Sequence, residues 1–418
     1  MKSAFLIAWR GLWRGWTLWT LLVSVAALHL LLPGIVRSDG TDAGAFEMSV
    51  RVVCGAVAAI IYSAALAIGG GMFAKEREDE LLPLSLVRPA SAFSVAVGRW
   101  LAMVLLFACV VLANAALLNA LPQKGASWRS DCRVHLTPSM PPAEVSAAKA
   151  MEEFLRDERT PEAVRKSPRA AVLSLLTAKE NERYEIVRPG QTSSWPFSGL
   201  VTGPFWVKTR FSTMYNLKTK LNGVFRIGNL TGIVSNNTQA VLEIPLAVTA
   251  GSNTNGVDML TFTNTGKTDV MLRPRRDIEI LAPGDSFLAN SIRASIEILS
   301  LAGLLAAFGL FLSSALSRPV ALFTSSVLLA AALMAPDAVA EFPDEFNATF
   351  GEKAGLAISR IVMSLTSAIS DVSPVSDLAT GKAIAAKDVL RSVVDGLILF
   401  PSILLAFTAC LLRRKTKC

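Results

Sequence analysis

Six long apolar stretches constrain this chain more than any other feature of its sequence. A helix needs about 20 mainly apolar residues to cross the hydrocarbon core of a bilayer. Only 18% of the residues are charged, against about a quarter in a typical soluble domain. We therefore expect an α-helical polytopic membrane protein with six transmembrane helices, at 16–36, 52–73, 100–121, 298–316, 320–335 and 394–412.

Basic residues predict which side of the membrane the loops face, because Lys and Arg concentrate in short cytoplasmic loops. One set of segments holds twelve Lys and Arg in 50 residues, and the opposite set holds seven in 73. The rich set is 1–15, 74–99, 317–319 and 413–418, and the poor set is 37–51 and 336–393. We expect both termini in the cytoplasm and the chain in a bacterial inner (cytoplasmic) membrane. The net charge of +8 then reflects orientation and not binding to nucleic acid.

The residues before the first span predict a separate amphipathic helix lying in the membrane interface. Its apolar residues, spaced by four, four and three positions, are Phe5, Trp9, Trp13 and Trp16. Arg10 and Arg14 lie on a neighbouring face. The alternative is that these residues are the tryptophan-anchored start of the first span. With this helix and spans one to three, residues 1–121 form the first part of the predicted fold.

Residues 122–293 are predicted to form an extracytoplasmic α+β domain between spans three and four. Residues 144–180 show helical spacing, with an apolar stripe of Val145, Ala148, Met151 and Leu155. Residues 184–285 alternate apolar and polar side chains, which is typical of strands with one buried face. We expect mainly an antiparallel β-sandwich of about 100 residues, with Asn264-Thr265-Gly266-Lys267 as a hairpin turn. Residues 294–418 hold spans four to six, with outer helices within 355–390.

The predicted cytoplasmic loop 74–99 combines a charged cluster with an apolar stretch. The apolar residues Leu81, Leu82, Leu84, Leu86 and Val87 are too few to cross the membrane. They are also too apolar for a solvated loop, which gains nothing from them. A docking surface for a soluble partner explains both features. A turn on the membrane surface with snorkelling charges is the alternative.

This loop resembles that of the permeases of the ATP-binding-cassette type-2 exporter class. In that class the loop contains the coupling helix, which sits on the ATPase subunit. Where the family usually shows Gly-Thr and Gly-Lys, this chain has Asp79-Glu80 and Gly98-Arg99. The resemblance covers the membrane portion, a little over half of the chain. The residues that carry it are Glu76-Arg77-Glu78, Leu81-Leu82, Leu84-Ser85, Arg88-Pro89, Ser91 and Gly98-Arg99.

The resemblance implies the permease subunit of an exporter, with no enzyme activity of its own. ATP and Mg would bind a separate cytoplasmic ATP-binding-cassette ATPase, so no cofactor is expected in this chain. A second permease half, either another copy or a sister permease, would complete the transporter. The residues that the resemblance assigns to ATPase coupling are Glu76, Glu78, Leu82, Leu84, Arg88 and Pro89.

Polar residues inside the spans are candidates for a substrate path, because such groups usually face the bundle or a cavity. They are His29, Asn114 and Asn119. Hydrogen bonding between helices is the alternative for each. Glu297 and Asp395 are expected at span ends, where water reaches them. The triplet at 69–71, three glycines, predicts close helix packing, with a hinge as the alternative.

Other motifs are weak. Gly266-Lys267-Thr268 ends like a phosphate-binding loop, but the glycine needed five positions earlier is Thr261. Cys132 and His135 have metal-like spacing without a second pair of ligands, so no metal site is predicted. An intramembrane enzyme would lack any recognisable catalytic set. The alternative function is a non-transporting membrane-anchored protein whose outer β-domain binds an extracytoplasmic partner.

Overall fold

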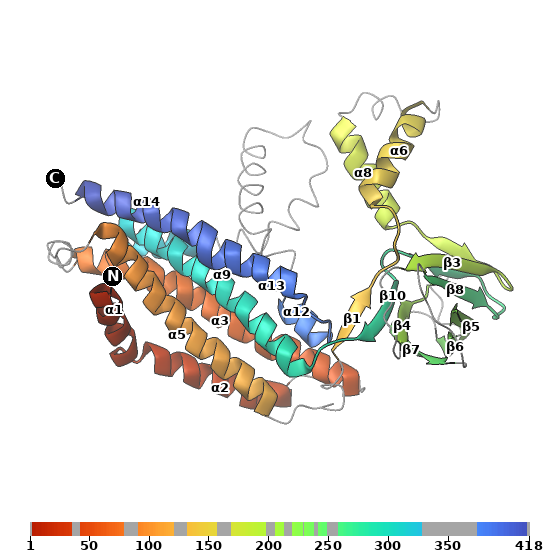
Figure 1. The fold of residues 1–418 in the computed structure, drawn as a ribbon, viewed down its shortest axis with the longest axis horizontal. Helices are drawn as coiled ribbons and strands as arrows, with labels where there is room; N and C mark the ends of the chain where they lie inside the picture. The colour runs from red at the N-terminus through yellow and green to blue at the C-terminus, as the bar shows by residue number, and fades with distance from the viewer. Residues whose placement is uncertain are drawn as a thin grey trace. The chain divides into compact units, whose positions relative to one another are not determined.

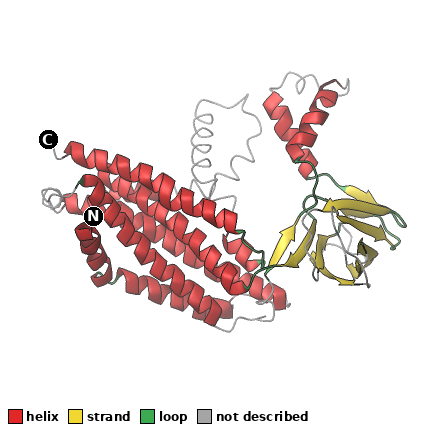
Figure 2. Ribbon diagram, viewed as in Figure 1, coloured by secondary structure: helices red, strands yellow, loops and turns green. Residues whose placement is uncertain are grey.

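The chain forms two compact units, which are described separately. Segments up to Cys132 and from Asp285 onward form a helical unit, and Arg133–Gly284 forms a β-rich unit, here the β unit. Figure 1 and Figure 2 show the helices and strands. The computed structural model describes residues 2–35, 42–78, 91–120, 132–156, 169–197, 205–212, 220–228, 230–237, 241–248, 258–327 and 374–415.

Long apolar helices dominate the helical unit. Its elements are α1 (Lys2–Arg14), α2 (Thr17–Ile35), α3 (Asp42–Glu78), α5 (Ala92–Ala120), α9 (Phe287–Ala315), α12 (Pro374–Ala379), α13 (Ala386–Val393), the π-helix η2 (Val394–Leu399) and α14 (Phe400–Lys415). Within the described residues, five helical segments are long and apolar enough to cross a membrane: Thr17–Ile35, Ala45–Ala74, Ala92–Ala120, Phe287–Ala315 and Ala386–Arg413. The chain is therefore a polytopic membrane protein. Each segment overlaps a predicted span. Of the predicted span 320–335, residues 320–327 are helical, and 328–335 lie outside the described residues.

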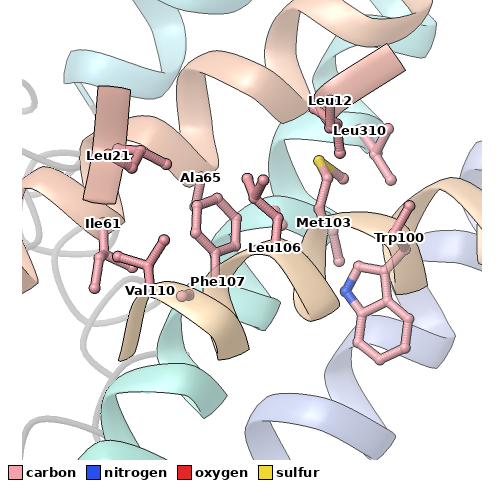
Figure 3. Close-up of a cluster of buried hydrophobic side chains, with 14 of the residues drawn as sticks. Leu12, Leu21, Ile61, Ala65, Trp100, Met103, Leu106, Phe107, Val110 and Leu310 are labelled. Atoms are coloured by element: carbon pink, nitrogen blue, oxygen red, sulfur yellow. The ribbon is translucent and has the colours of Figure 1, made fainter. Parts of the chain in front are cut away.

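Helices α3, α5 and α9 meet in a tightly packed centre (Figure 3). Ile61 and Ala65 of α3, Phe107 of α5 and Leu310 of α9 are fully buried there. The indole Nε1 of Trp100 donates a hydrogen bond to the carbonyl oxygen of Gly303 at 2.8 Å, which links α5 to α9. Because lipid tails are as apolar as these side chains, such close fit and interhelical bonding hold the bundle together.

Glycines allow α3 and α9 to approach each other closely. A Cβ atom at Gly69 would lie 2.7 Å from the carbonyl oxygen of Ala306, and one at Gly309 would lie 2.9 Å from the backbone nitrogen of Gly70. Helix α3 runs without interruption through the triplet to Glu78. The predicted packing role of the triplet is confirmed, and the alternative of a hinge is not supported.

Helix α1 is separate from α2, as predicted. Trp16 between them adopts a φ of 61°, which ends the first helix. The predicted apolar stripe divides into two parts. Phe5 and Trp9 pack against the core of the bundle beside buried Leu12, whereas Trp13 and Trp16 are 45% and 73% exposed. One part of the stripe therefore holds α1 on the bundle, and the other is free to contact lipid.

Helix α9 begins well before the predicted start of the fourth span. The hydroxyl of Ser286 caps it by accepting a hydrogen bond from the backbone N–H of Ala289 at 3.3 Å. The first turns carry polar residues that are buried against neighbouring helices, among them Asn290 and Glu297. The prediction that Glu297 sits at a span end within reach of water is wrong, because the residue is only 5% exposed.

The β unit contains antiparallel pairings, with two helices, α6 (Ala143–Arg156) and α8 (Arg169–Asn181). The order of the large sheet is β1-β10-β4-β7-β6-β5-β8-β3, and β2 pairs with β9. The strands are β1 (Arg133–Leu136), β2 (Glu185–Val187), β3 (Thr192–Phe197), β4 (Phe205–Arg210), β5 (Lys220–Ile227), β6 (Leu230–Asn237), β7 (Val241–Val248), β8 (Asp258–Asn264), β9 (Val270–Leu272) and β10 (Ile278–Pro283).

One core lies inside the large sheet. Phe205, Val207 and Thr209 of β4 are buried, whereas Trp206 and Lys208 are half-buried and Arg210 is exposed, which confirms the predicted alternation. Trp195 of β3 and Ile280 of β10 come from opposite ends of the strand order, yet both belong to the same buried cluster. Strands β1-β10-β4-β7 and strands β6-β5-β8-β3 therefore enclose one core and are joined only by a short pairing of β6 with β7, which fits the predicted β-sandwich.

Two details of the β unit differ from expectation. Helix α6 buries Ala147 against Val172 of α8, while Val145 of the predicted stripe is 44% exposed. The predicted hairpin turn after β8 is wrong, because β8 pairs with β3 and β5 while β9 pairs with β2. The Asn264 side chain shapes this turn, since Oδ1 accepts from the backbone of Gly266 and Nδ2 donates to two carbonyl oxygens. Such local bonding gives the same residue pattern as a hairpin.

Candidate functional site

The predicted coupling loop starts where α3 ends and returns to the bundle at α5. Glu76 and Glu78 lie in the last turns of α3, and Glu78 is exposed. At the other end, the hydroxyl of Ser91 accepts a hydrogen bond from the backbone N–H of Ser94 at 3.2 Å, which caps α5. The other predicted coupling residues, Leu82, Leu84, Arg88 and Pro89, lie outside the described residues.

An ion pair joins the two helix ends that border this loop. The Nη2 atom of Arg99 on α5 donates to Oε2 of Glu76 on α3 at 2.6 Å. The Arg99 side chain is only 7% exposed and the Glu76 side chain 29%. The guanidinium carbon also lies 4.4 Å from the ring centroid of buried Phe73. A short charge-assisted bond combined with a cation–π contact fixes the two helix ends relative to each other. We call Phe73, Glu76 and Arg99 the helix-end clamp.

The clamp changes the interpretation of Glu76. The resemblance assigned Glu76 to ATPase coupling, and the structure adds that its carboxylate bonds Arg99 in the same chain. Arg99 was recognised only as the basic residue that precedes the third span. Its Nη1 atom is buried and has no hydrogen-bond partner among the described residues. The polar pattern of the sequence contained both charges, but not their contact across the loop.

The three residues proposed for a substrate path do not form one cluster. On α2, the Nδ1 atom of buried His29 lies 3.0 Å from the carbonyl oxygen of Val25 in its own helix. On α5, Asn114 is buried, and its Oδ1 atom has no hydrogen-bond partner among the described residues. Asn119 donates to Ser291 of α9 at 2.9 Å. Asn119 therefore has the interhelical bond that the alternative interpretation expects.

Glu297 is a polar residue in the bundle that the sequence interpretation set aside. It lies within α9, and neither carboxylate oxygen has a hydrogen-bond partner among the described residues. Tyr62 of α3, Asp377 of α12 and Asp388 of α13 lie close enough to interact with it electrostatically. The signal that could have found it is one acidic residue within a long stretch of small and apolar residues.

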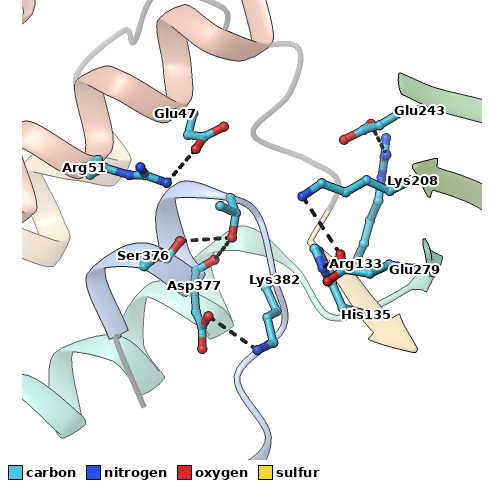
Figure 4. A network of polar contacts seen from close by, with 11 residues as sticks. Glu47, Arg51, Arg133, His135, Lys208, Glu243, Glu279, Ser376, Asp377 and Lys382 are labelled. Atoms are coloured by element: carbon cyan, nitrogen blue, oxygen red, sulfur yellow. Dashed lines mark hydrogen bonds and ion pairs between the residues drawn. The ribbon is translucent and has the colours of Figure 1, made fainter. Parts of the chain in front are cut away.

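The short helices α12 and α13 cover the first turns of α9. The side-chain amide of Asn290 donates to the carbonyl oxygen of Lys382 at 2.8 Å and accepts from the backbone N–H of Ile384 at 2.7 Å. Lys382 also forms an ion pair with Asp377 at 3.5 Å (Figure 4). These elements fall in the predicted outer-helix region 355–390, of which 355–373 lie outside the described residues.

The β unit carries its own charged clusters. Figure 4 shows Arg133 of β1 beside Glu243 of β7, and His135 and Lys208 beside Glu279 of β10. His135 is thus bonded to a carboxylate. Cys132, the second residue of the metal-like pair, packs in an apolar cluster. Among the described residues, no group of three or more His, Cys, Asp or Glu is placed to hold a metal ion.

A second cluster lies between α8 and β10. Asp277 is buried and accepts hydrogen bonds from Arg273, including one from Nε at 3.0 Å. Glu182 binds Arg273 and Arg276, each at 2.6 Å. The bond from Arg273, with a smaller contribution from Arg276 and against some desolvation, lowers the pKa of the Glu182 carboxyl. The stability that this pairing contributes is present at neutral pH and lost as the pH falls through the lowered pKa.

Substitution of Asp277 by alanine is expected to destabilise the β unit by about 2 kcal/mol, because it leaves the Arg273 side chain short of a buried partner. Hydrogen exchange of the slowest amides in β4 and β8 of the full chain measures this loss. The matched control is Glu180→Gln, which breaks an ion pair of 3.4 Å with Arg183, whose side chain is 73% exposed. We expect the control to change stability by less than about 0.5 kcal/mol. Equal effects of the two substitutions would contradict the assignment of Asp277 as the anchor.

Comparison with protein-family models, with curated proteins and with solved structures finds no match to this chain.

Proposed function

We propose that the chain is the transmembrane permease subunit of an ATP-binding-cassette exporter in a bacterial cytoplasmic membrane. ATP hydrolysis, with its Mg, would take place on a separate cytoplasmic ATPase. Translocation would require a second permease half, either another copy of the chain or a sister permease. The observation that carries the proposal is the helix-end clamp, in which Glu76 and Arg99 join the ends of α3 and α5 on either side of the loop 79–90.

The clamp suits a loop that passes force to the membrane. Next to Arg99, Trp100 bonds α5 to Gly303 of α9. Helix α9 in turn contacts α3 through Gly69 and Gly309. A displacement of the loop would therefore move three tightly joined helices as one body, and rigid-body movement of this kind underlies many switching transitions. A loop anchored in this way has a mechanical role that a simple membrane anchor does not need.

The alternative is a membrane-anchored protein whose β unit binds an extracytoplasmic partner. The observation that favours it is a groove of about 590 Å³ in the β unit, lined by residues that include Arg183, Tyr184 and Arg275. Purification of the full chain from native membranes distinguishes the two proposed functions. A P-loop ATPase that copurifies supports the permease. Its consistent absence, with a partner retained by the β unit, supports the anchor.

Substitution of both Leu82 and Leu84 by glutamate is expected to abolish ATPase association while leaving membrane insertion intact. An apolar docking surface loses its contact when charged groups must be desolvated against the partner. Copurification of the ATPase with the variant measures association, and alkaline extraction of membranes measures insertion. The control is Val145→Glu on exposed α6, which should leave association unchanged. ATPase association at the normal level in the inserted double variant would remove the coupling role.

A further inference from the structure

Glu297 is a buried acidic side chain in the first half of α9. It is 5% exposed, and both of its carboxylate oxygens lack a hydrogen-bond partner in the described part of the chain. Arg293, four residues before Glu297 on α9, forms an ion pair with Asp285 at 2.6 Å. Four basic side chains on elements that contact α9 also bond other carboxylates: Arg51 with Glu47, Arg99 with Glu76, Lys382 with Asp377 and Arg391 with Asp395. Nothing described there neutralises Glu297 by an ion pair.

The groups that face Glu297 disfavour a negative charge. Asp377 of α12 and Asp388 of α13 are acidic, and Tyr62 of α3 is neutral. In η2, the Asp395 carboxylate forms an ion pair with Arg391, with Nε and Oδ2 3.7 Å apart. An isolated carboxylate removed from water is so costly that the group binds a proton and becomes neutral instead. Burial without a bonding partner therefore favours a protonated carboxyl group at Glu297.

The surroundings of Glu297 also contain a backbone irregularity. Ser300 lies one turn further along α9, and η2 contacts it so closely that a Cβ at Gly396 would lie 2.8 Å from the Ser300 carbonyl oxygen. A π-helix such as η2 is rare within helices and often marks a functional position. The π-helix beside Glu297 is a second observation, separate from the burial of the carboxylate.

We propose that Glu297 is an intramembrane proton-binding site, and that exchange of its proton is linked to the packing of α9 against α12, α13 and η2. The ligand is a proton because the described residues around it supply no set of three or more metal-ligating side chains. The proposal goes beyond the exporter function, which draws its energy from ATP on another chain, and it holds equally for the membrane-anchored alternative.

Dicyclohexylcarbodiimide tests the proposal on the full chain in membrane vesicles. The O–H bond of a protonated carboxyl group adds across a C=N bond of this apolar reagent. The adduct then rearranges to a stable N-acylurea, and no leaving group is released. Peptide mass spectrometry identifies the modified residue. We expect modification of Glu297 that increases as the pH is lowered. The variant Glu297→Gln should lose modification in this peptide, and the control Asp395→Asn should retain it.

Two results would overturn the proposal. The first is a Glu297 that stays unmodified from mildly alkaline to mildly acidic pH while exposed carboxyl groups react. The second is modification of Glu297 that tetraethylammonium or sodium ions block at constant pH. Such competition would mean that the site binds another cation in place of a proton. The wild-type chain alone decides both, so the proposal remains testable even if Glu297→Gln fails to fold. Loss of ATPase copurification has no bearing on either result, so failure of the exporter function is recognised separately.

Discussion

Replacement of Gly69 by leucine is expected to destabilise the helical unit by about 3 kcal/mol, the largest effect of any single glycine substitution considered for this bundle. A Cβ at this position would meet backbone atoms: the carbonyl oxygen of Ala306 at 2.7 Å and the Cα of Gly309 at 3.2 Å. Backbone cannot rotate away as a side chain can, so α3 and α9 must separate. Separation would also open the core around Leu310.

A matched pair of alanine variants in the same helix isolates this contact. At Gly55 the nearest atom to a new Cβ is a Val375 methyl carbon at 3.9 Å, an ordinary van der Waals distance. Gly55→Ala should therefore be neutral or stabilise by up to about 1 kcal/mol through helix propensity, whereas Gly69→Ala should destabilise. Thermal unfolding of the purified full chain, followed by its helical circular dichroism, compares them. Equal unfolding midpoints for Gly69→Leu and the wild type would show that α3 and α9 do not approach as described.

Hydropathy located the membrane helices but misplaced their beginnings. The pattern gave the apolar centre of each span, because lipid exposure imposes that composition. It could not give the first turns of α9, where Asn290 and Glu297 are polar but buried by α12 and α13. A hydropathy window counts such residues as outside the bilayer. Polar residues buried within a helix bundle are therefore assigned to the segments that flank a predicted span.

Alternation located the strands of the β unit but not their connections. The alternation within residues 184–285 predicted strands with one buried face, and Val207 and Phe262, two apolar residues of that pattern, are fully buried. Which strands pair depends on contacts between distant segments, and these leave no local signature. The turn at Asn264 shows the limit, because its side-chain bonds make the same local pattern whether or not β8 and β9 pair.

At the candidate site, too, the sequence predicted the local feature but not the contact between distant residues. The loop 74–99 was recognised from its mixture of charged and apolar residues, which is a local property. The clamp was missed because Glu76 and Arg99 are separated by the whole loop and meet only when α3 and α5 pack. The role of Leu82 and Leu84 stays a prediction. What the structure adds is that the charges at the ends of the loop bond each other and leave Glu78 as the exposed acid.

Removal of the Glu76 carboxylate by Glu76→Ala is expected to destabilise the helical unit by about 3 kcal/mol, because it leaves the buried Arg99 guanidinium without its charged partner. The Glu76→Ala/Arg99→Met double variant should lose less than the sum of the two single substitutions, with a coupling energy of about 2 kcal/mol. Arg99→Lys should rescue little, since an ammonium cannot stack on Phe73 while reaching Glu76 as the planar guanidinium does. Thermal unfolding of each full-length variant gives these values.

The chain supplies an internal control for this cycle. Arg51 and Glu47 of α3 form an ion pair with the same 2.6 Å separation, but their side chains are 46% and 39% exposed. Water already solvates both charges, so the corresponding Glu47→Ala/Arg51→Met cycle should give a coupling of only about 0.3–0.5 kcal/mol. A clamp coupling as small as this control would mean that Arg99 reaches water and that the ends of α3 and α5 move independently. Force could then not pass from the loop to the bundle through Glu76 and Arg99, and the permease proposal would lose the observation on which it rests.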